Sequence, residues 1–515
     1  MSAQNQKSDE WHAAGIDLDP TDVPNLDLIL GGGLPHGSLA LVIGPPGSGK
    51  TTLANQMAFG AAARGRRAVV VTALSESTSK LLSHLRSFSF YVDQFVGDQI
   101  TVVSLDQYLS SGLTTARDEL IQITRKTRAS VVVLDGFRGV RGAEEDIQAA
   151  RHFLYDVGGT LSTLGVTTII TSEADPRDPH FFPESTAADV IIGLHYDLVV
   201  VQQRRAIEII KMRGAEPMPG LHGIWLNGSG LTVYPRVEAR SISPHEAIEP
   251  TEATLEEAER LRTQPLEKVA FGLSELDTLL SGGLPRGSST LVIGSLGTGK
   301  TTLALHFAVA GVQLAEPTVY VSFRENLTQL LQKASAFALG HELLAGLAVG
   351  GGLILQHWTP VELKPDIVAD RLVAAVDRVQ ARRLVVDSVA ELEHALYESG
   401  QPERTESYLG AIVDELRKRA VTTLFIREHE VTVARQLQLA PGPVAVLAEN
   451  VLLLQHIEDD AALHRVLSVV KMRVTPHDAV LHEFTISPPD GIRLLGQFRR
   501  HTQRAGTSTS REQVK

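Results

Sequence analysis

The strongest constraint on the fold is a nine-residue, glycine-rich segment that occurs twice in the chain. GPPGSGKTT occupies residues 44–52, and GSLGTGKTT occupies residues 294–302. Both fit the pattern of a phosphate-binding loop (P-loop), in which a glycine and four further residues precede Gly-Lys-Thr. An apolar, strand-like run comes before each copy and a helix-like run comes after it, as such a loop requires. We therefore expect two anion sites, each at the start of a helix.

The likeness between the two halves extends well beyond the loops. NLDLILGGGLPHGSLALVIG at 25–44 resembles ELDTLLSGGLPRGSSTLVIG at 275–294. Strand-like runs that end in aspartate, VTT runs and KMR triplets recur later in the same order, and their offset drifts from 250 to 260 positions. The repeat predicts two homologous domains at 17–240 and 266–498, a linker at 241–265, and flexible ends at 1–16 and 499–515.

Apolar runs of strand length alternate with helix-like runs in each half. LALVIG, RRAVVVTAL and VVVLD are strand-like in the first half, and STLVIG, TVYVSF and LVVDS are strand-like in the second. Continuous apolar strands that alternate with helices indicate a parallel sheet buried on both faces. The predicted fold class is α/β, with a mostly parallel central sheet and helices on both faces in each domain.

Composition narrows the range of functions. The net charge is −12 and aromatic residues make up 5% of the 515 residues, which argues against a nucleic-acid partner. The chain has no cysteine, so disulfides, thiolate zinc sites and cysteine nucleophiles are excluded. The N-terminus is polar, and no apolar run approaches the ~18 residues of a membrane helix. We expect no membrane association and a cytoplasmic location.

The loops and the aspartates that follow them predict an ATP and Mg²⁺ site in each half. The P-loop threonine hydroxyl ligates magnesium, and an aspartate at the end of a neighbouring strand helps to hold the ion. The predicted magnesium-binding residues are Thr51, Asp135, Thr301 and Asp387. The alternative for each aspartate is a helix N-cap at a strand-to-loop junction. The predicted nucleotide-binding residues are Gly44, Gly47, Ser48, Gly49, Lys50, Thr51, Thr52, Gly294, Gly297, Thr298, Gly299, Lys300, Thr301 and Thr302.

Two glutamates are candidates for activating water. Glu76 and Glu325 lie at the end of the strand that follows the P-loop helix, where a carboxylate can face the terminal phosphate. The alternative is a solvated surface glutamate in each case.

The KMR triplets supply candidate catalytic cations. They place Lys211 and Arg213, and Lys471 and Arg473, two positions apart on a strand, so that both side chains of a pair point to one side. Such a pair suits the charge that develops on a phosphoryl group. The alternative is a basic edge strand, which discourages aggregation.

The doubled unit, with LDxxLxGGLPxGS before the loop and KMR near the end, resembles the KaiC family of two-domain ATPases in the RecA superfamily. The resemblance covers about 17–499 and is especially close in KMRVTPHDAVLHEFTIS at 471–487. It implies two tandem RecA-like domains stacked as a double ring, usually a hexamer, with ATP between neighbouring subunits. It also implies that the lysine and arginine of KMR act on the nucleotide of the next subunit.

The sequence departs from the clock-type members of that family in two places. Those members carry adjacent glutamates after the strand, whereas this chain has Ser75 before Glu76 and Arg324 before Glu325. They also phosphorylate an adjacent Ser-Thr pair, but no Ser, Thr or Tyr occurs from 433 to 467, where Ala445 and Val446 align with the pair. The departures predict slow or impaired hydrolysis and no phosphorylation cycle of that type.

Four functions therefore stay open. The leading hypothesis is a ring ATPase that couples nucleotide state to assembly or to an unidentified protein partner. A serine/threonine kinase that acts on itself or on a partner is the second, with acceptors in the C-terminal tail at 507–510. A DNA-repair ATPase is the third, and a nucleotide-bound scaffold without hydrolysis is the fourth.

Overall fold

A computed structural model describes residues 17–72, 77–137, 147–178, 183–199, 202–240, 255–256, 259, 266–348, 350, 352–428, 448–459 and 462–499. The chain divides into two compact units, residues 1–242 and 243–515. Each unit is described by itself below. The predicted ends and linker lie almost entirely outside the described residues, so the predicted boundaries at 17–240 and 266–498 stay a prediction.

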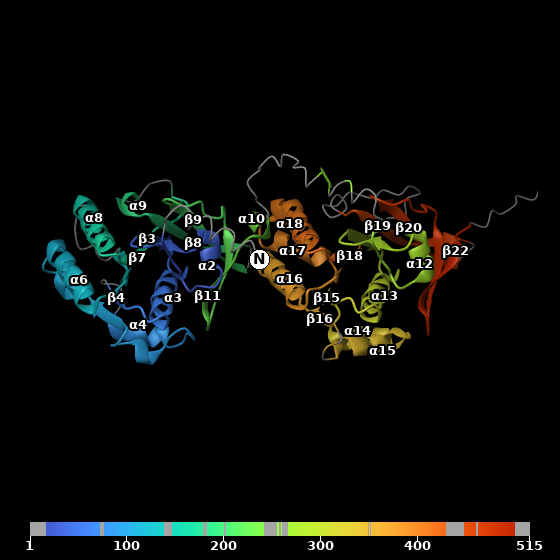
Figure 1. The fold of residues 1–515 in the computed structure, drawn as a ribbon, viewed down its shortest axis with the longest axis horizontal. Coiled ribbons are helices and arrows are strands. Elements are labelled where there is room, and N and C mark those ends of the chain that lie inside the picture. The colour runs from blue at the N-terminus through green and yellow to red at the C-terminus, as the bar shows by residue number, and fades with distance from the viewer. Residues whose placement is uncertain are drawn as a thin grey trace, which may run out of the picture. The chain divides into compact units, whose positions relative to one another are not determined.

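Unit 1 alternates strands and helices, as predicted (Figure 1). Its elements are β1 (Leu18–Asp19), α2 (Leu26–Leu30), β2 (Leu34–Pro35), β3 (Leu39–Gly44), α3 (Lys50–Ala63), β4 (Ala68–Thr72), α4 (Thr78–Leu85), η1 (Asp93–Phe95), β5 (Ile100–Ser104), α5 (Asp106–Leu109), α6 (Leu113–Thr127), β6 (Val131–Asp135), α8 (Ile147–Thr163), β7 (Thr167–Glu173), α9 (Pro183–Ala187), β8 (Val190–Val199), β9 (Gln202–Met212), β10 (His222–Asn227), β11 (Gly230–Tyr234) and α10 (Val237–Arg240).

Unit 2 repeats this order with small differences. Its elements are β12 (Lys268–Val269), α12 (Ser274–Leu279), β13 (Leu284–Pro285), β14 (Ser289–Gly294), α13 (Lys300–Gln313), β15 (Thr318–Ser322), α14 (Leu327–Ser335), α15 (Leu339–Leu347), β16 (Leu353–His357), α16 (Pro365–Val379), β17 (Arg383–Asp387), α17 (Ala390–Glu398), η2 (Pro402–Arg404), α18 (Thr405–Lys418), β18 (Thr422–Glu428), β19 (Asn450–Asp459), β20 (Ala462–Met472), β21 (His482–Ser487) and β22 (Gly491–Gln497).

Both units are built on a nine-stranded sheet with the same strand order. In unit 1 the order is β5-β4-β6-β7-β3-β8-β9-β10-β11, and in unit 2 it is β16-β15-β17-β18-β14-β19-β20-β21-β22. Neighbours are parallel from β5 to β8 and from β16 to β19, and the last three strands of each sheet add on in antiparallel fashion. The predicted fold class, two tandem RecA-like α/β domains with mostly parallel sheets, is confirmed.

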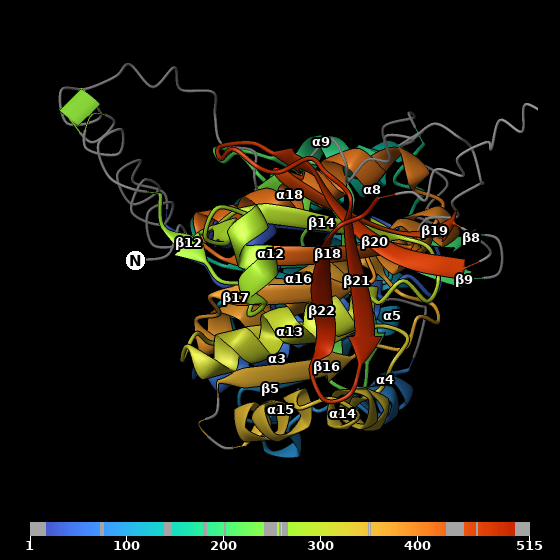
Figure 2. The same cartoon turned by 90° about the vertical axis from the view of Figure 1, so that its right-hand side faces the viewer.

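Helices cover both faces of the parallel part of each sheet. Val70 of β4 packs into a core under α3, whereas Val69 and Val71 pack into a second core under α6 and α8. In Figure 1, α3 lies on one side of the first sheet and α6 and α8 lie on the other. In unit 2, β22 packs against α13, and Figure 2 shows β21 and β22 running across that helix. The continuous apolar strands follow from this burial on two sides.

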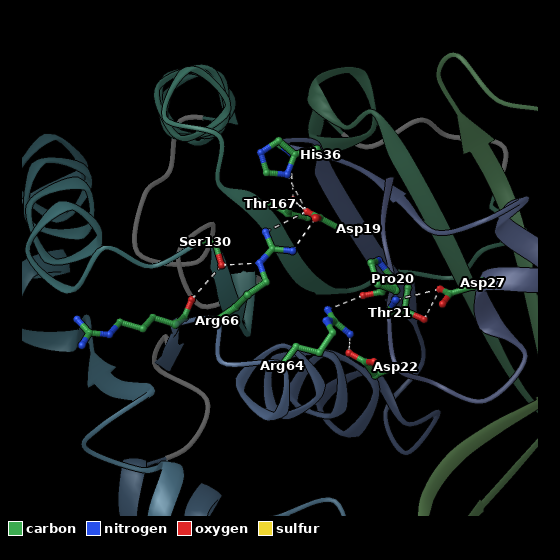
Figure 3. Close-up of polar contacts among 12 residues, drawn as sticks. Asp19, Pro20, Thr21, Asp22, Asp27, His36, Arg64, Arg66, Ser130 and Thr167 are labelled. Atoms are coloured by element: carbon green, nitrogen blue, oxygen red, sulfur yellow. Dashed lines mark hydrogen bonds and ion pairs between the residues drawn. The ribbon is translucent and has the colours of Figure 1, made fainter. Parts of the chain in front are cut away.

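Asp19 of β1 ties the N-terminal hairpin of unit 1 to the sheet (Figure 3). Its Oδ1 accepts from Arg66 Nη1 at 2.5 Å, and its Oδ2 accepts from the hydroxyl of Thr167 at 2.6 Å. Burial by itself raises the pKa of Asp19, but the hydrogen bonds and the Arg66 charge outweigh it and hold that pKa below its usual value. Thr167 begins β7, so this network lies at the edge of the sheet where the parallel strands begin.

Unit 2 uses a buried arginine for the same purpose. The side chain of Arg383, at the start of β17, is fully buried. Its Nε donates to Glu316 Oε2 at 2.6 Å, and its Nη1 donates to the carbonyl oxygens of Ala270 and Phe307 at 2.8 and 3.0 Å. Such a charge is stable in the interior only because a carboxylate and backbone acceptors surround it. The P-loops lie on the opposite side of each sheet, at the carboxyl ends of the parallel strands.

Candidate functional site

The two predicted P-loops have nearly the same backbone. Gly47 and Gly49 have φ angles of 77° and 105°, and Gly297 and Gly299 have φ angles of 76° and 98°. These left-handed values favour glycine and turn the loop back on itself between a buried strand and a helix. The helices α3 and α13 begin at Lys50 and Lys300, directly after the second of these glycines. Their first N–H groups therefore face the loop, where they could bind an anion.

The P-loop lysines lie over the loop. Lys50 Nζ donates to the carbonyl oxygens of Gly44 and Pro45 at 2.9 and 3.0 Å, and Lys300 Nζ donates to that of Ser295 at 2.7 Å. Burial lowers the pKa of both lysines, and nearby carboxylates oppose that shift. Each ammonium can exchange weak carbonyl contacts for a phosphate, which supports the predicted role.

The predicted magnesium-binding pairs come together in both units. Thr51 Oγ1 donates to Asp135 Oδ1 at 3.1 Å, and Thr301 Oγ1 donates to Asp387 Oδ2 at 2.9 Å. A hydroxyl and a carboxylate are hard oxygen ligands, and Mg²⁺ is typically held by one or two carboxylates together with phosphate oxygens and waters. The donor set fits that ion. Within the described parts of the chain, no group of three or more His, Cys, Asp or Glu side chains is placed to hold a metal.

Different residues orient the two aspartates. In unit 1, Thr171 of β7 donates its hydroxyl to Asp135 Oδ1 at 2.5 Å and accepts from the N–H of Gly136 at 2.9 Å. In unit 2, the buried Tyr320 of β15 donates its hydroxyl to Asp387 Oδ2 at 3.1 Å. Burial raises the pKa of Asp387 and outweighs the hydrogen bonds from Thr301 and Tyr320. A bound cation would favour the ionised carboxylate.

A pocket of about 420 Å³ opens beside the P-loop of unit 2. Its size lies within the range of small-molecule sites. The residues that line it are Leu296, Gly297, Gly299, Lys300, Thr301, Thr302, Ser322, Arg324, Glu325, Lys333, Asp387, Ser388, Ile426, Glu428 and Ile486. The loop, the predicted magnesium-binding pair and the candidate catalytic glutamate of this unit thus share one cavity.

Glu325 lies where the sequence places it, but it is not solvated freely. Its backbone N–H donates to Ser322 Oγ at 3.1 Å, and its Oε1 accepts from the ammonium of Lys333. Its Oε2 is buried and has no hydrogen-bond partner among the described residues. A buried carboxylate oxygen without a partner suits a water molecule. Glu76, the equivalent candidate in unit 1, lies outside the described residues.

A second pair of glutamates was missed by the sequence analysis. Glu173 ends β7 opposite Gly44, and Glu428 ends β18 opposite Gly294. Their charges raise the pKa of the P-loop lysines against the effect of burial. The repeat contained the signal, because both glutamates follow their VTT runs at the same distance, TTIITSE and TTLFIRE.

The KMR residues lie away from their own P-loops. Val190, at the start of β8, pairs with Ala40 of β3 and with Met212 of β9, so the triplet lies near the start of β3. Gly44 ends β3 four residues further on, roughly 13 Å along the strand. In unit 2, Asn450 pairs with both Thr290 and Met472 in the same way.

The lysine and the arginine of each triplet have different surroundings. Lys211 Nζ donates to the carbonyl oxygens of Ser185 and Ala188 at 3.0 and 2.6 Å, and Lys471 Nζ donates to that of Ala448 at 2.7 Å. The side chain of Arg213 is 61% exposed. Arg473 is also exposed. The strands β9 and β20 end at Met212 and Met472, so each arginine lies just beyond its strand whereas each lysine lies within it. The arginines can therefore meet a second molecule, whereas the lysines hold the backbone before β8 and β19.

No helix in the described ranges is long and apolar enough to cross a membrane.

Comparison with known proteins agrees with this arrangement. A family model described as "ATPase: KaiC" matches residues 19–238 and again residues 269–498. The chain is 24% identical over 504 residues to the circadian clock oscillator protein KaiC of Thermostichus vulcanus, an alignment that covers 95% of this chain and 91% of that protein.

Two proteins of Synechocystis sp. are similar to the same extent. The circadian clock oscillator protein KaiC 1 is 24% identical over 515 residues, with 97% of this chain and 93% of that protein covered. The circadian clock protein KaiC3 is 25% identical over 509 residues, with 95% and 94% covered. The family model covers most of the chain in two copies, one in each unit. The chain belongs to the KaiC family of ATPases.

Proposed function

We propose that this chain is a Mg²⁺-ATP-binding and ATP-hydrolysing ring ATPase that couples nucleotide state to assembly or to a protein partner. The observation that carries the proposal is the repeated hydrogen bond between the P-loop threonine and the strand-end aspartate, at 3.1 Å in unit 1 and 2.9 Å in unit 2. The Walker-type lysine, threonine and aspartate are thus assembled in both units before any ligand is added.

The loop and its lysine bind the phosphates. The N–H groups of the loop and of the first helical turn surround the phosphate oxygens, and Lys50 or Lys300 leaves its carbonyl acceptors for the terminal phosphates. Thr51 with Asp135, and Thr301 with Asp387, would hold a magnesium ion, which would neutralise charge that develops on the phosphoryl oxygens.

A glutamate positions the attacking water. In unit 2, the partnerless Oε2 of Glu325 accepts a hydrogen bond from that water, and the carboxylate takes up its proton as the oxygen bonds to the γ-phosphorus. The bond between the γ-phosphorus and the bridging oxygen then breaks, and ADP and phosphate are the products. Glu76 has this role in unit 1.

The position of the KMR residues supports a site shared between two copies of the chain. Arg213 and Arg473 lie near the edge of the sheet where the parallel strands begin, away from their own P-loops. Each arginine would meet the nucleotide of the next subunit, and Lys211 and Lys471 would hold the segment that presents it. A head-to-tail contact of this kind closes into a ring, for which we propose a homo-hexameric double ring.

Incubation of the purified chain with Mg²⁺ and γ-labelled ATP tests the function. Free phosphate without labelled protein is expected. Lys50→Ala and Lys300→Ala should each remove part of the release, and the double variant should remove all of it. Lys418→Ala is the matched control, because Lys418 pairs with Glu415 on α18 and does not line the pocket.

Two other results would contradict the proposal. Nucleotide binding with neither product would identify a scaffold, to which the ion pair of Glu325 with Lys333 would then contribute. Label on the protein would identify a kinase instead.

A further inference from the structure

Arg324 is a cation inside the pocket beside the P-loop of unit 2. It lines the same cavity as Lys300, Thr301 and Asp387. Its positive charge beside the P-loop attracts a polyanionic ligand.

The backbone on both sides of Arg324 is held firmly. The preceding Phe323 is buried, and its N–H donates to the carbonyl oxygen of Asp387 at 2.9 Å. The following Glu325 N–H donates to Ser322 Oγ, and Asn326 caps α14 in a capping box with Gln329. The side chain of Arg324 therefore starts from a fixed point at the mouth of the pocket.

The guanidinium of Arg324 is held by two carboxylates and faces the pocket of unit 2. Its Nε donates to Glu391 Oε1 at 2.8 Å, and its Nη1 donates to Glu428 Oε2 at 2.5 Å. Among the residues that the structure describes, no hydrogen bond uses Nη2. The side chain of Arg324 is 56% exposed, whereas those of Glu391 and Glu428 are 12% and 28% exposed. Nη2 can therefore donate to a phosphate oxygen while Nε and Nη1 keep their carboxylates.

Glu428 links Arg324 to the P-loop lysine. Its charge raises the pKa of Lys300, and the charge of Arg324 lowers it further, in the same direction as burial. Both cations thus lie within electrostatic reach of one carboxylate at the end of β18. A terminal phosphate has several acceptor oxygens and can take a planar guanidinium and an ammonium together.

We propose that Arg324 contacts the terminal phosphate of a nucleoside triphosphate bound in its own unit, and that it makes unit 2 prefer ATP over ADP. This inference rests on the proposed function of unit 2. A cation in this place acts in cis, as a counterpart to the arginines supplied by the next subunit. Unit 1 has Ser75 at the equivalent position. The two sites should therefore differ in their ability to distinguish ATP from ADP.

Nucleotide affinity tests the proposal in the full-length Lys50→Ala chain, in which only unit 2 binds. The probes are the Mg²⁺ complexes of ADP and of a non-hydrolysable ATP analogue, measured by calorimetry. Arg324→Gln should weaken binding of the analogue about 10- to 100-fold, the value of a charged hydrogen bond, and should change ADP binding less than about threefold. Arg324→Lys should give an intermediate loss.

Two variants distinguish phosphate contact from a purely structural role. Arg419→Gln is the matched control, because Arg419 also bridges two carboxylates, Asp377 and Glu415, but does not line the pocket. It should leave both affinities unchanged. Glu391→Gln removes a competitor for the guanidinium, so it should not weaken binding of the analogue. If Arg324 has only a structural role, Glu391→Gln should weaken binding of the ATP analogue.

The outcomes separate this inference from the function on which it rests. Equal loss of ADP and analogue affinity in Arg324→Gln, or no loss of either, would overturn the role of Arg324 alone. Failure of the Lys50→Ala chain to bind either nucleotide would overturn both the inference and the proposed nucleotide site of unit 2.

Discussion

Equivalent aspartates in the two units are oriented by side chains of different chemistry. Asp135 accepts from Thr171, which comes from the strand on one side of β6, whereas Asp387 accepts from Tyr320, which comes from the strand on the other side of β17. Both hydroxyls fix the carboxylate oxygen that also meets the P-loop threonine. Such outer partners of a metal ligand influence affinity through orientation.

Variants that lack these hydroxyls should therefore bind Mg²⁺ more weakly, although the predicted magnesium ligands themselves are unchanged. Tyr320→Phe in unit 2 and Thr171→Val in unit 1 should each raise the Mg²⁺ concentration for half-maximal phosphate release about 10-fold in the affected unit. A magnesium titration, with the other unit silenced by its P-loop lysine variant, measures this. Tyr397→Phe, at an exposed position of α17, is the control. An unchanged titration would show that the P-loop alone positions the aspartate.

His306 predicts a pH dependence of stability. Its ring is buried on α13, and its Nε2 accepts from the N–H of Ile492 at 3.1 Å. Burial lowers the pKa of His306 from 6.5 to about 4. Above pH ~6.5 the ring is neutral in both folded and unfolded chains, so the contribution is fully present. As the pH falls further, the unfolded chain binds the proton first, and stability is lost until about pH 4.

The wild-type chain should thus lose roughly 2–3 kcal/mol more stability than His306→Gln between pH 7 and pH 4.5. Urea unfolding at each pH measures the difference, and glutamine keeps an acceptor for Ile492 but does not titrate. Parallel pH curves for the two chains would mean that the ring is protonated in the folded state.

Local motifs explain which site residues the sequence predicts. The loops, with Asp135 and Asp387, are recognisable because P-loop chemistry needs those residue types at fixed positions. Glu173 and Glu428 belong to no motif and reach the loop only through the pairing of β7 with β3 and of β18 with β14. The pairing of Glu325 with Lys333 across the start of α14 likewise depends on side-chain packing. The assigned roles of all these residues stay predictions.

At the scale of elements, the P-loop depends on close approach between β14 and its neighbour β19. A Cβ atom on Gly294 would lie 2.6 Å from the carbonyl oxygen of Leu454 and 2.8 Å from Thr298 Oγ1. Leu454 belongs to a strand inside the sheet, so its carbonyl cannot move away. Gly44 meets Leu194 in the same way in unit 1. The first glycine of each loop is therefore needed for strand packing as well as for the turn.

Gly294→Ala should consequently destabilise unit 2 by about 1–3 kcal/mol and abolish its nucleotide binding. Gly159→Ala is the control, because Gly159 lies in α8 with nothing within 4 Å of an added Cβ atom. That change should stabilise the chain by about 0.5–1 kcal/mol. Chemical unfolding and nucleotide titration check both results, and wild-type binding by Gly294→Ala would refute the packing argument.

The order of elements was predictable, whereas their lateral arrangement was not. Apolar strands that alternate with helices predict a parallel sheet with two covered faces, and both units have one. The place of β3 between β7 and β8 follows from pairings between residues more than 100 positions apart. Sequence periodicity contains no information on such contacts. The sequence patterns also did not predict the antiparallel strands β9 to β11 and β20 to β22.

At the scale of the whole molecule, the two units share one framework but differ in their polar groups. Unit 2 has Arg324 and the Glu325–Lys333 ion pair in its pocket, and Tyr320 on its aspartate. Unit 1 has Ser75 at the position equivalent to Arg324, and Thr171 of a different strand contacts its aspartate. We therefore expect the two nucleotide sites to differ in how fast they hydrolyse ATP and how long they retain it.

The central claim is that each nucleotide is hydrolysed between two copies of the chain, and mixed oligomers test it most directly. One chain carries Lys50→Ala and Lys300→Ala, and the other carries Arg213→Ala and Arg473→Ala. Each should be inactive alone. After co-expression, some interfaces combine the intact P-loop of the arginine variant with the intact arginine of the lysine variant. If the two chains mix at random, about a quarter of the interfaces have this composition, so phosphate release should return to about a quarter of the wild-type rate. Mixed oligomers without restored release, or full activity of the arginine variant alone, would contradict the claim.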